Sequence, residues 1–128
     1  MTQEDKELIF KELCARLPYH VKCKIWLKDG TTEEGALDLE HNYGNVLQDS
    51  FYYNKIKDIK PYLFPLSSMT EEEKEEYCQL QQRVIYNSKG VINEDVTKYI
   101  NWCYKKHLDI NNLIPMELAI DATGLNIY

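Results

Sequence analysis

The segment of residues 60–73 constrains the fold more than any other, because it carries two prolines between a strand-like half and a helical half of the chain. Pro61 and Pro65 fix the backbone φ angle and remove two hydrogen-bond donors, so residues 62–66 are expected to be extended and not to form a central strand. The segment is too apolar for a free linker. We therefore expect residues 61–69 to pack as a strap across the seam between a sheet and the helix that follows. The side chains expected at this seam are Tyr62, Leu63, Phe64 and Leu66.

A helix is predicted to begin directly after the strap. Thr70 can accept a hydrogen bond from the backbone of Glu73, and the Glu73 carboxylate can accept one from the backbone of Thr70, which is the pattern of a capping box. Glu71, Glu72 and Glu73 also place negative charge in the first turn, where the helix dipole stabilises it. The sequence therefore predicts a helix that starts at Glu71.

The half before the strap combines one helix with segments typical of strands. Apolar residues recur at helical spacing over residues 3–16, and Pro18 ends this pattern. Residues 21–28 alternate apolar and polar side chains, which predicts a half-buried strand that ends in a turn at Asp29-Gly30. Three further strands are predicted, over residues 31–39, 46–53 and 56–60. The first of these is expected to have a bulge at Gly35.

The half after the strap has the spacing of helices. The first of them is expected to end at residues 87–90, where Gly90 can adopt the left-handed conformation that follows a helix. Asn93 is expected to cap a second helix, and one stripe of that helix includes Cys103 and His107. Residues 116–128 are apolar enough to dock on the rest of the chain but show no clear period.

Together these elements predict an α+β fold. It comprises an N-terminal helix, a small antiparallel sheet of three to four strands, and two or more C-terminal helices. An SH3-like arrangement fits the sheet as a shape, and a shape alone carries no function. The expected single domain, residues 1–128, divides into a helix over residues 1–17, the sheet over 20–60, the strap over 61–69 and a helical part over 70–128.

Several motifs also resemble a known group of sequences. They are Lys60-Pro61-Tyr62-Leu63, Pro65-Leu66-Ser67-Ser68-Met69-Thr70-Glu71-Glu72, Trp102, His107-Leu108-Asp109, Leu113-Ile114 and Leu118-Ala119. These motifs resemble a family of uncharacterised proteins from the genomes of gut bacteria and from their phages and prophages. The resemblance covers roughly half of the chain. It implies a bacterial or phage origin and brings with it no activity and no catalytic residue.

The net charge and the cysteine spacing indicate which partners and which cell compartment to expect. The 128 residues carry a net charge of −6, and neither half of the chain is basic, so nucleic acid is not the expected partner. The first residues are polar and acidic, and no run is long and apolar enough for a transmembrane helix. The four cysteines are widely spaced and expected to be reduced, which favours a cytoplasmic protein.

One face of the strand predicted at residues 21–28 carries Lys22, Lys24, Trp26 and Lys28. This face could bind nucleic acid, with the indole stacked on a base and the ammonium groups near phosphates. The alternative is a solvated strand face on which the first helix or the strap covers Trp26. The net negative charge of the chain favours the alternative.

The same region resembles the first motif of Sm-like barrels. The matching residues are Lys28-Asp29-Gly30, Gly35 and Asn45-Val46-Leu47-Gln48-Asp49. The second motif of that family, whose Arg-Gly pair lines the RNA site, has no counterpart before Pro61. The resemblance therefore implies a small barrel-like sheet and gives little support for RNA binding.

No cluster of residues predicts catalysis. Cys103 and His107 are four residues apart and could supply two metal ligands, but no second pair at zinc spacing accompanies them, and His20 and His41 stand alone. The sequence contains no phosphate loop, dinucleotide fingerprint, nucleophile elbow or metalloprotease helix. We therefore assign no catalytic, cofactor-binding or metal-binding residue and expect no cofactor.

Three functions follow from these observations. The first is a non-enzymatic interaction or accessory protein whose partner is a protein. The second is a nucleic-acid-binding module that uses the Lys and Trp strand face. The third is a small enzyme, which would need a concave pocket that holds two or more titratable groups. The sequence leaves the oligomeric state open.

Overall fold

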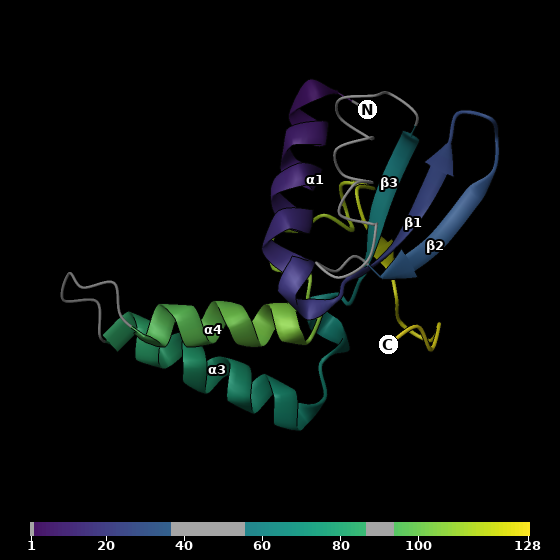
Figure 1. Cartoon of the computed structure of the whole chain (residues 1–128). Helices are drawn as coiled ribbons and strands as arrows, with labels where there is room; N and C mark the ends of the chain where they lie inside the picture. The colour runs from purple at the N-terminus through teal and green to yellow at the C-terminus, as the bar shows by residue number, and fades with distance from the viewer. Residues whose placement is uncertain (1, 37–55, 87–93) are drawn as a thin grey trace.

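The computed structural model describes residues 2–36, 56–86 and 94–128. Figure 1 shows an α+β arrangement, as the sequence predicts. The elements are α1 (Gln3–Arg16), the 3-10 turn η1 (Leu17–Tyr19), β1 (Lys22–Leu27), β2 (Thr32–Ala36), β3 (Ile56–Leu63), the 3-10 turn η3 (Leu66–Ser68), α3 (Glu71–Tyr86), α4 (Glu94–Lys105) and β4 (Ile120–Asp121). Several predicted features lie outside the described residues: the end of the strand at 31–39, the strand at 46–53, the helix end at 87–90, the cap at Asn93, and the residues at 41 and 45–49 discussed for metal and Sm-like motifs.

The described strands form a four-stranded sheet in the order β2-β1-β3-β4. β1 lies antiparallel to β2 and to β3, as predicted, whereas β4 pairs with β3 in parallel. The prediction of an antiparallel sheet is therefore wrong at this strand, and the sheet is mixed. β4 has only two residues, Ile120 and Asp121, so it is too short to show an alternating pattern in the sequence.

β3 contradicts the prediction that residues 62–66 stay out of the central sheet. The strand continues through Pro61 and lies between β1 and β4. Pro61 faces Cys23 of β1, and the pairing with β4 begins one residue later, at Tyr62. A strand tolerates proline where no neighbouring strand requires its amide proton. The strap is therefore shorter than predicted and begins at Phe64.

The shortened strap docks on the chain that follows α4. The backbone N–H of Phe64 donates to the carbonyl of His107 at 2.8 Å, and the backbone N–H of Asp109 donates to the carbonyl of Phe64 at 2.8 Å. The Phe64 side chain is half-buried. The strap therefore docks on residues 107–109. The sequence had predicted that it would dock on the helix that starts at Glu71.

β1 has the predicted alternation, and the turn after it forms as expected. Cys23 and Ile25 are buried, whereas Lys24 is half-buried on the opposite face. In the turn, Gly30 has a φ of +91°, a value that favours glycine. Gly35 pairs with β1 in regular register, so the bulge predicted at this glycine is wrong.

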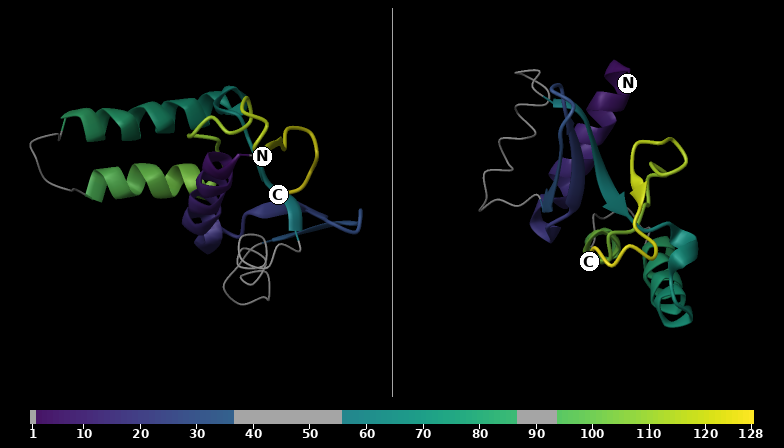
Figure 2. Two further views of the ribbon diagram at one scale, coloured as in Figure 1. Left: turned by 90° about the horizontal axis from the view of Figure 1, so that it is seen from above. Right: turned by 90° about the vertical axis from the view of Figure 1, so that its right-hand side faces the viewer.

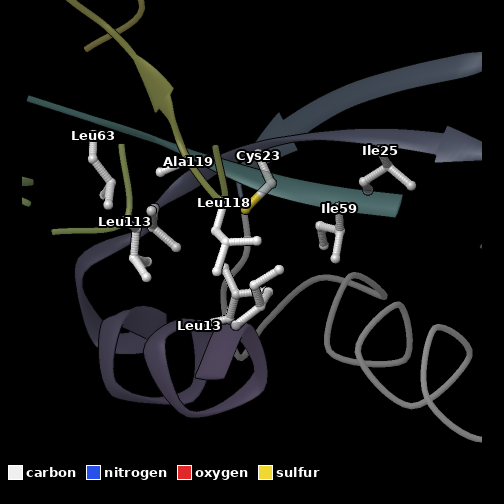
Figure 3. Close-up of a cluster of buried hydrophobic side chains, with 10 residues drawn as sticks. Leu13, Cys23, Ile25, Ile59, Leu63, Leu113, Leu118 and Ala119 are labelled. Atoms are coloured by element: carbon white, nitrogen blue, oxygen red, sulfur yellow. The ribbon is translucent and has the colours of Figure 1, made fainter. Parts of the chain in front are cut away.

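α1 packs on the face of the sheet that carries Cys23. The helix starts at a capping box in which Thr2 and Asp5 exchange hydrogen bonds. Ile9 and Leu13, one turn apart, are fully buried against the strands, and Figure 3 shows the cluster that they join. The buried core comprises Ile9, Leu13, Val21, Cys23, Ile25, Ile59, Leu63, Leu113, Leu118 and Ala119. We call α1, the sheet and the segments that complete this core the body.

A buried ion pair links α1 to the chain after α4. Arg16 is completely buried, and its Nε donates to Glu12 Oε1 at 2.7 Å. The Arg16 Nη2 donates to the carbonyl of Leu108 at 2.6 Å, and Asn111 donates to Glu12 Oε2 at 2.7 Å. The guanidinium carbon lies 4.7 Å from the centre of the Tyr104 ring. Arg16 therefore holds the end of α4 and the residues after it against α1.

α3 and α4 form a helical hairpin that points away from the body (Figure 1). α3 starts at the predicted capping box, in which Thr70 and Glu73 exchange hydrogen bonds of 3.0 and 3.2 Å. The hydroxyls of Tyr77 and Tyr99 lie 3.0 Å apart between the two helices, and Gln81 donates to Tyr77 at 3.0 Å. The left view of Figure 2 shows the two helices side by side. Polar and aromatic contacts therefore hold the hairpin together.

Candidate functional site

An open groove lies where the strap, the end of α4 and the C-terminal segment meet. Its volume is about 460 Å³. We call it the tail groove, and its lining residues are Phe64, Ser68, Met69, Glu73, Lys105, Lys106, His107, Leu108, Thr123, Gly124 and Tyr128. It is concave and includes several titratable groups, so it is the candidate site for binding or catalysis.

The aromatic wall of the tail groove is built on His107. α4 ends at Lys105, and His107 follows it with a φ of +56°. The His107 ring stacks on the Tyr128 ring, with centroids 3.7 Å apart and planes 13° apart. The Phe64 ring lies 5.8 Å from the Tyr128 ring in a tilted arrangement. Three rings from distant parts of the chain thus form one apolar wall.

His107 is held in its neutral form. Burial, and then the positive charges of Arg16, His20 and Lys22, lower the pKa of His107 from 6.5 to about 4. Its Nδ1 is buried and has no hydrogen-bond partner among the described residues. A neutral imidazole with so low a pKa is a weak proton acceptor near neutral pH.

Tyr128 fastens the C-terminal segment across the sheet. Its hydroxyl accepts from the backbone N–H of Lys22 at 2.8 Å and donates to the carbonyl of Tyr62 at 2.8 Å. Burial raises the pKa of Tyr128 well above the ordinary value. The hydroxyl is therefore occupied by structural hydrogen bonds and is not placed to transfer a proton to a ligand.

The rim of the tail groove combines two lysines with one carboxylate. The Lys106 Nζ lies 3.8 Å from Glu73 Oε2. Hydrogen bonding from the backbone of Thr70, in the capping box, is the main cause that lowers the pKa of Glu73, and the charge of Lys106 contributes. Lys105 is exposed. Because Glu73 offsets only one of the two ammonium groups, the rim is electropositive in a chain whose net charge is −6.

The structure partly assembles the lysine and tryptophan face that the sequence suggested. The Lys24 Nζ lies 5.5 Å from the centre of the Trp26 ring, and the Nζ of Lys60, from β3, lies 5.7 Å from it. Lys24 and Lys60 face one another across β1 and β3. Glu34 of β2 also lies on this face, 4.0 Å from Lys24. The face therefore mixes charges of both signs around one indole ring.

The other two residues of the predicted strip have different surroundings. Lys22 is directed to the C-terminal segment: its Nζ donates to the carbonyl of Ile127 and lies 5.8 Å from the centre of the Tyr128 ring. Lys28 is exposed beyond the end of β1. α1 packs on the opposite face of the sheet, and the strap bonds to residues 107–109, so neither of the two predicted covers is seen over Trp26 within the described part of the chain.

The predicted helix stripe that includes Cys103 does not reach His107. His107 lies past the end of α4, so the two side chains do not share a helical stripe. Burial raises the pKa of the Cys103 thiol to about 11, which disfavours the thiolate that binds metals. In residues 2–36, 56–86 and 94–128, no group of three His, Cys, Asp or Glu side chains is arranged to hold a metal ion.

Comparison with protein-family models, with curated proteins and with solved structures gives no match. Of the helices described here, none combines the length and the apolar character required to cross a membrane.

No direct signal in the sequence indicated the tail groove. Its rings come from Phe64, His107 and Tyr128, which are far apart along the chain. The strap motif and His107-Leu108-Asp109 are both motifs of the sequence, but no spacing placed them together. The structure brings these two motifs into contact through the backbone of Phe64.

Proposed function

We propose that this chain is a non-enzymatic interaction protein that binds an extended segment of a partner protein in the tail groove. The observation that carries the proposal is the combination of an aromatic wall, made by Phe64, His107 and Tyr128, with an electropositive rim at Lys105 and Lys106. An apolar wall with a few polar groups at its edge is typical of ligand and peptide sites. The chemistry fits a segment that carries an acidic residue next to an aromatic or aliphatic one.

The titratable groups of the groove favour binding over catalysis. A small enzyme would need a poised acid or base. Glu73 instead caps α3 and pairs with Lys106, and its pKa is lowered. His107 is neutral with a buried Nδ1, and the Tyr128 hydroxyl is fully engaged by the backbone. Each of these three groups already has a structural role or is a poor acceptor.

A display library of random linear peptides tests the proposal. We expect the parent chain to enrich peptides that contain an acidic residue beside an apolar one. Thr123→Trp should abolish this enrichment, because it fills the groove from an exposed position. Lys105→Glu with Lys106→Glu should remove the preference for acidic residues, since the rim changes sign.

Lys24→Glu serves as the matched control, because it changes the same kind of charge on a face away from the groove. It should enrich the same peptides as the parent chain. The proposal is wrong if the parent and Thr123→Trp select the same peptides, or if neither selects any.

Nucleic-acid binding is the second candidate, and one observation favours it: the ammonium groups of Lys24 and Lys60 both lie close to the Trp26 ring. An indole flanked by cations can stack on a base while the cations meet phosphates. Glu34 on the same face opposes this use. Titration of labelled single-stranded DNA and RNA at low salt decides, because true binding would weaken steeply with salt and would be lost in Trp26→Ala.

The sequence motifs support a bacterial or phage origin, and we propose that the protein acts in the cytoplasm. If the partner is encoded beside this chain, the neighbouring genes include it. A survey of the neighbouring genes therefore provides candidate partner proteins, whose segments can be synthesised and tested directly against the tail groove and its Thr123→Trp variant.

A further inference from the structure

The hairpin has much surface and little core. In the parts of α3 and α4 whose side chains are described, Cys103 is the one buried residue. The two helices meet mainly through partly buried aromatic and polar groups, such as the hydroxyls of Tyr77 and Tyr99 and the rings of Tyr77 and Trp102, which lie 6.2 Å apart. Most helical stability in proteins comes from packing one face of a helix against another element. A further helical layer against the hairpin would supply that packing.

One face of the hairpin carries a shallow groove of about 180 Å³. It is lined by Glu76, Gln79, Leu80 and Arg83 of α3 and by Trp102 of α4. The four residues of α3 follow the spacing i, i+3, i+4, i+7, so they form one continuous stripe along the helix. We call these four residues the α3 stripe. Opposite charges stand at its two ends, and Gln79 and Leu80 stand at its middle.

The α3 stripe is complementary to a second copy of itself. In a two-fold symmetric pair, if residue i of one copy faces residue j of the other, then j also faces i. An axis midway between Gln79 and Leu80 in an antiparallel pair sets Glu76 of each copy opposite Arg83 of the other. A parallel pair would set like charges against each other, which is unfavourable. The order of charges therefore selects the antiparallel arrangement.

The side chains are available for such a contact. Glu76 and Arg83 are exposed, and Leu80 is half-buried. The Trp102 Nε1 donates to Glu76 Oε2 at 3.0 Å, which holds the carboxylate beside the groove and leaves its other oxygen able to accept from a guanidinium. The Trp102 ring also provides a large apolar surface next to Leu80.

We propose that the α3 stripe is the contact face of a homodimer, in which α3 of each copy packs antiparallel against α3 of the other. The occupant is a second copy because the charge complementarity is internal to the stripe and needs no other sequence. The two hairpins then stack as helical layers, and the antiparallel direction places the two bodies at opposite ends of the paired helices. This inference does not depend on what the tail groove binds.

Charge exchange between two variants tests both the face and its direction. Sedimentation equilibrium of the parent chain, over about 1 μM to 1 mM, should show a dimer. Glu76→Arg and Arg83→Glu should each raise the dimer Kd about tenfold or more, because two attractive contacts become repulsive in each symmetric pair.

An equimolar mixture of the two variants should dimerise again. The arginine introduced in one variant then faces the glutamate introduced in the other, while the unchanged Arg83 and Glu76 of the two chains face each other across the axis. The double variant, which carries both substitutions, should also dimerise with itself, because it keeps opposite charges at the two ends of the stripe.

The controls separate dimer loss from misfolding. Gln82→Arg adds the same charge at an exposed position on another face of α3 and should leave the Kd unchanged. Glu76→Gln keeps an acceptor for Trp102 while it removes the charge, so a weakened dimer in this variant reports the charge itself. The proposal is overturned if the parent chain stays monomeric over the whole range, if the single variants dimerise as the parent does, or if the mixture fails to restore the dimer.

Discussion

The body and the hairpin are stabilised by different kinds of contact. The body surrounds a continuous aliphatic core that α1, β1, β3 and residues 113–119 share, and even its buried Arg16 is paired. The hairpin has 16 residues in α3 and 12 in α4, and its contacts are hydroxyl, amide and aromatic groups at partly solvated positions. Core burial contributes several kcal/mol per large side chain, whereas a partly exposed hydrogen bond contributes about 1 kcal/mol. We therefore expect the body to resist unfolding and the hairpin to open locally.

Ion pairs give the largest expected contrast. Glu12→Ala leaves the fully buried Arg16 without its carboxylate, so we expect a loss of about 3–5 kcal/mol in the free energy of unfolding. Glu71→Ala removes an exposed pair with Lys74 in the hairpin and should cost less than about 1 kcal/mol. Urea unfolding followed by circular dichroism measures both. Similar midpoints for the two variants would contradict the contrast.

Apolar truncation gives the next largest difference. Leu13 is fully buried between α1 and the strands, so Leu13→Ala should cost about 2–5 kcal/mol. Ile100 in α4 is only half-buried, and Ile100→Ala should cost less than about 1.5 kcal/mol. Urea melts of the two variants beside the parent give the values. A larger loss for Ile100→Ala would place the main core in the hairpin.

The junction between the two regions is expected to depend on pH through His107. Its pKa is about 4 in the folded chain and near 6.5 when unfolded, so the unfolded chain binds a proton that the folded chain excludes between these values. Stability should therefore fall as the pH is lowered from about 6.5 to 4, by about 1–2 kcal/mol, because the ring is partly solvated.

His107→Asn should reduce this pH dependence, and asparagine tolerates the φ of +56° at this position. His20→Asn, at an exposed residue with a φ of +55°, should reduce the slope less, because His20 adds only one of the charges that lower the pKa of His107. Urea melts at pH 7, 5.5 and 4.5 compare the three chains. If His107→Asn keeps the full slope of the parent chain, groups other than His107 produce it.

The smallest effect should appear in local opening of the hairpin. Tyr77→Phe removes the hydroxyl that meets Tyr99 and Gln81, at a cost of about 0.5–1.5 kcal/mol. The thiol of Cys103, buried in α4, should then react several-fold faster with a maleimide under native conditions. The thiol of Cys23, buried in β1, should react at an unchanged rate. Equal acceleration at both thiols would mean that the hairpin and the body open together.

The sequence predicted the features that depend on neighbouring residues. The capping box at Thr70 and the alternation of β1 both rest on spacings of two to three residues, and the structure confirms both. The helix stripe that included His107 was wrong because periodicity shows where a helix can continue and not where it ends. α4 ends at Lys105, and a left-handed residue follows two positions later.

The features that the sequence did not predict depend on distant partners. The missing N–H of Pro61 is a local property, and it predicted that the sheet would end there. Whether a strand needs that N–H depends on its neighbour, and the neighbouring strand β4 lies near residue 120. The buried position of Arg16 requires Glu12 and also the carbonyl of Leu108. The tail groove likewise joins the strap to residues 105–108 and to the C-terminal segment. No short window of sequence contains such information.

The parallel pairing of β3 with β4 has a consequence for how chains of this kind can vary in length. Tyr62 pairs with Ile120, so α3 and α4 lie within one long loop that the sheet closes. The entropy of closing a loop grows only logarithmically with its length, and each doubling costs about 0.6 kcal/mol. Insertion or deletion of whole helical turns in the hairpin would therefore change the reach of the two helices while it hardly affects the pairing of these strands.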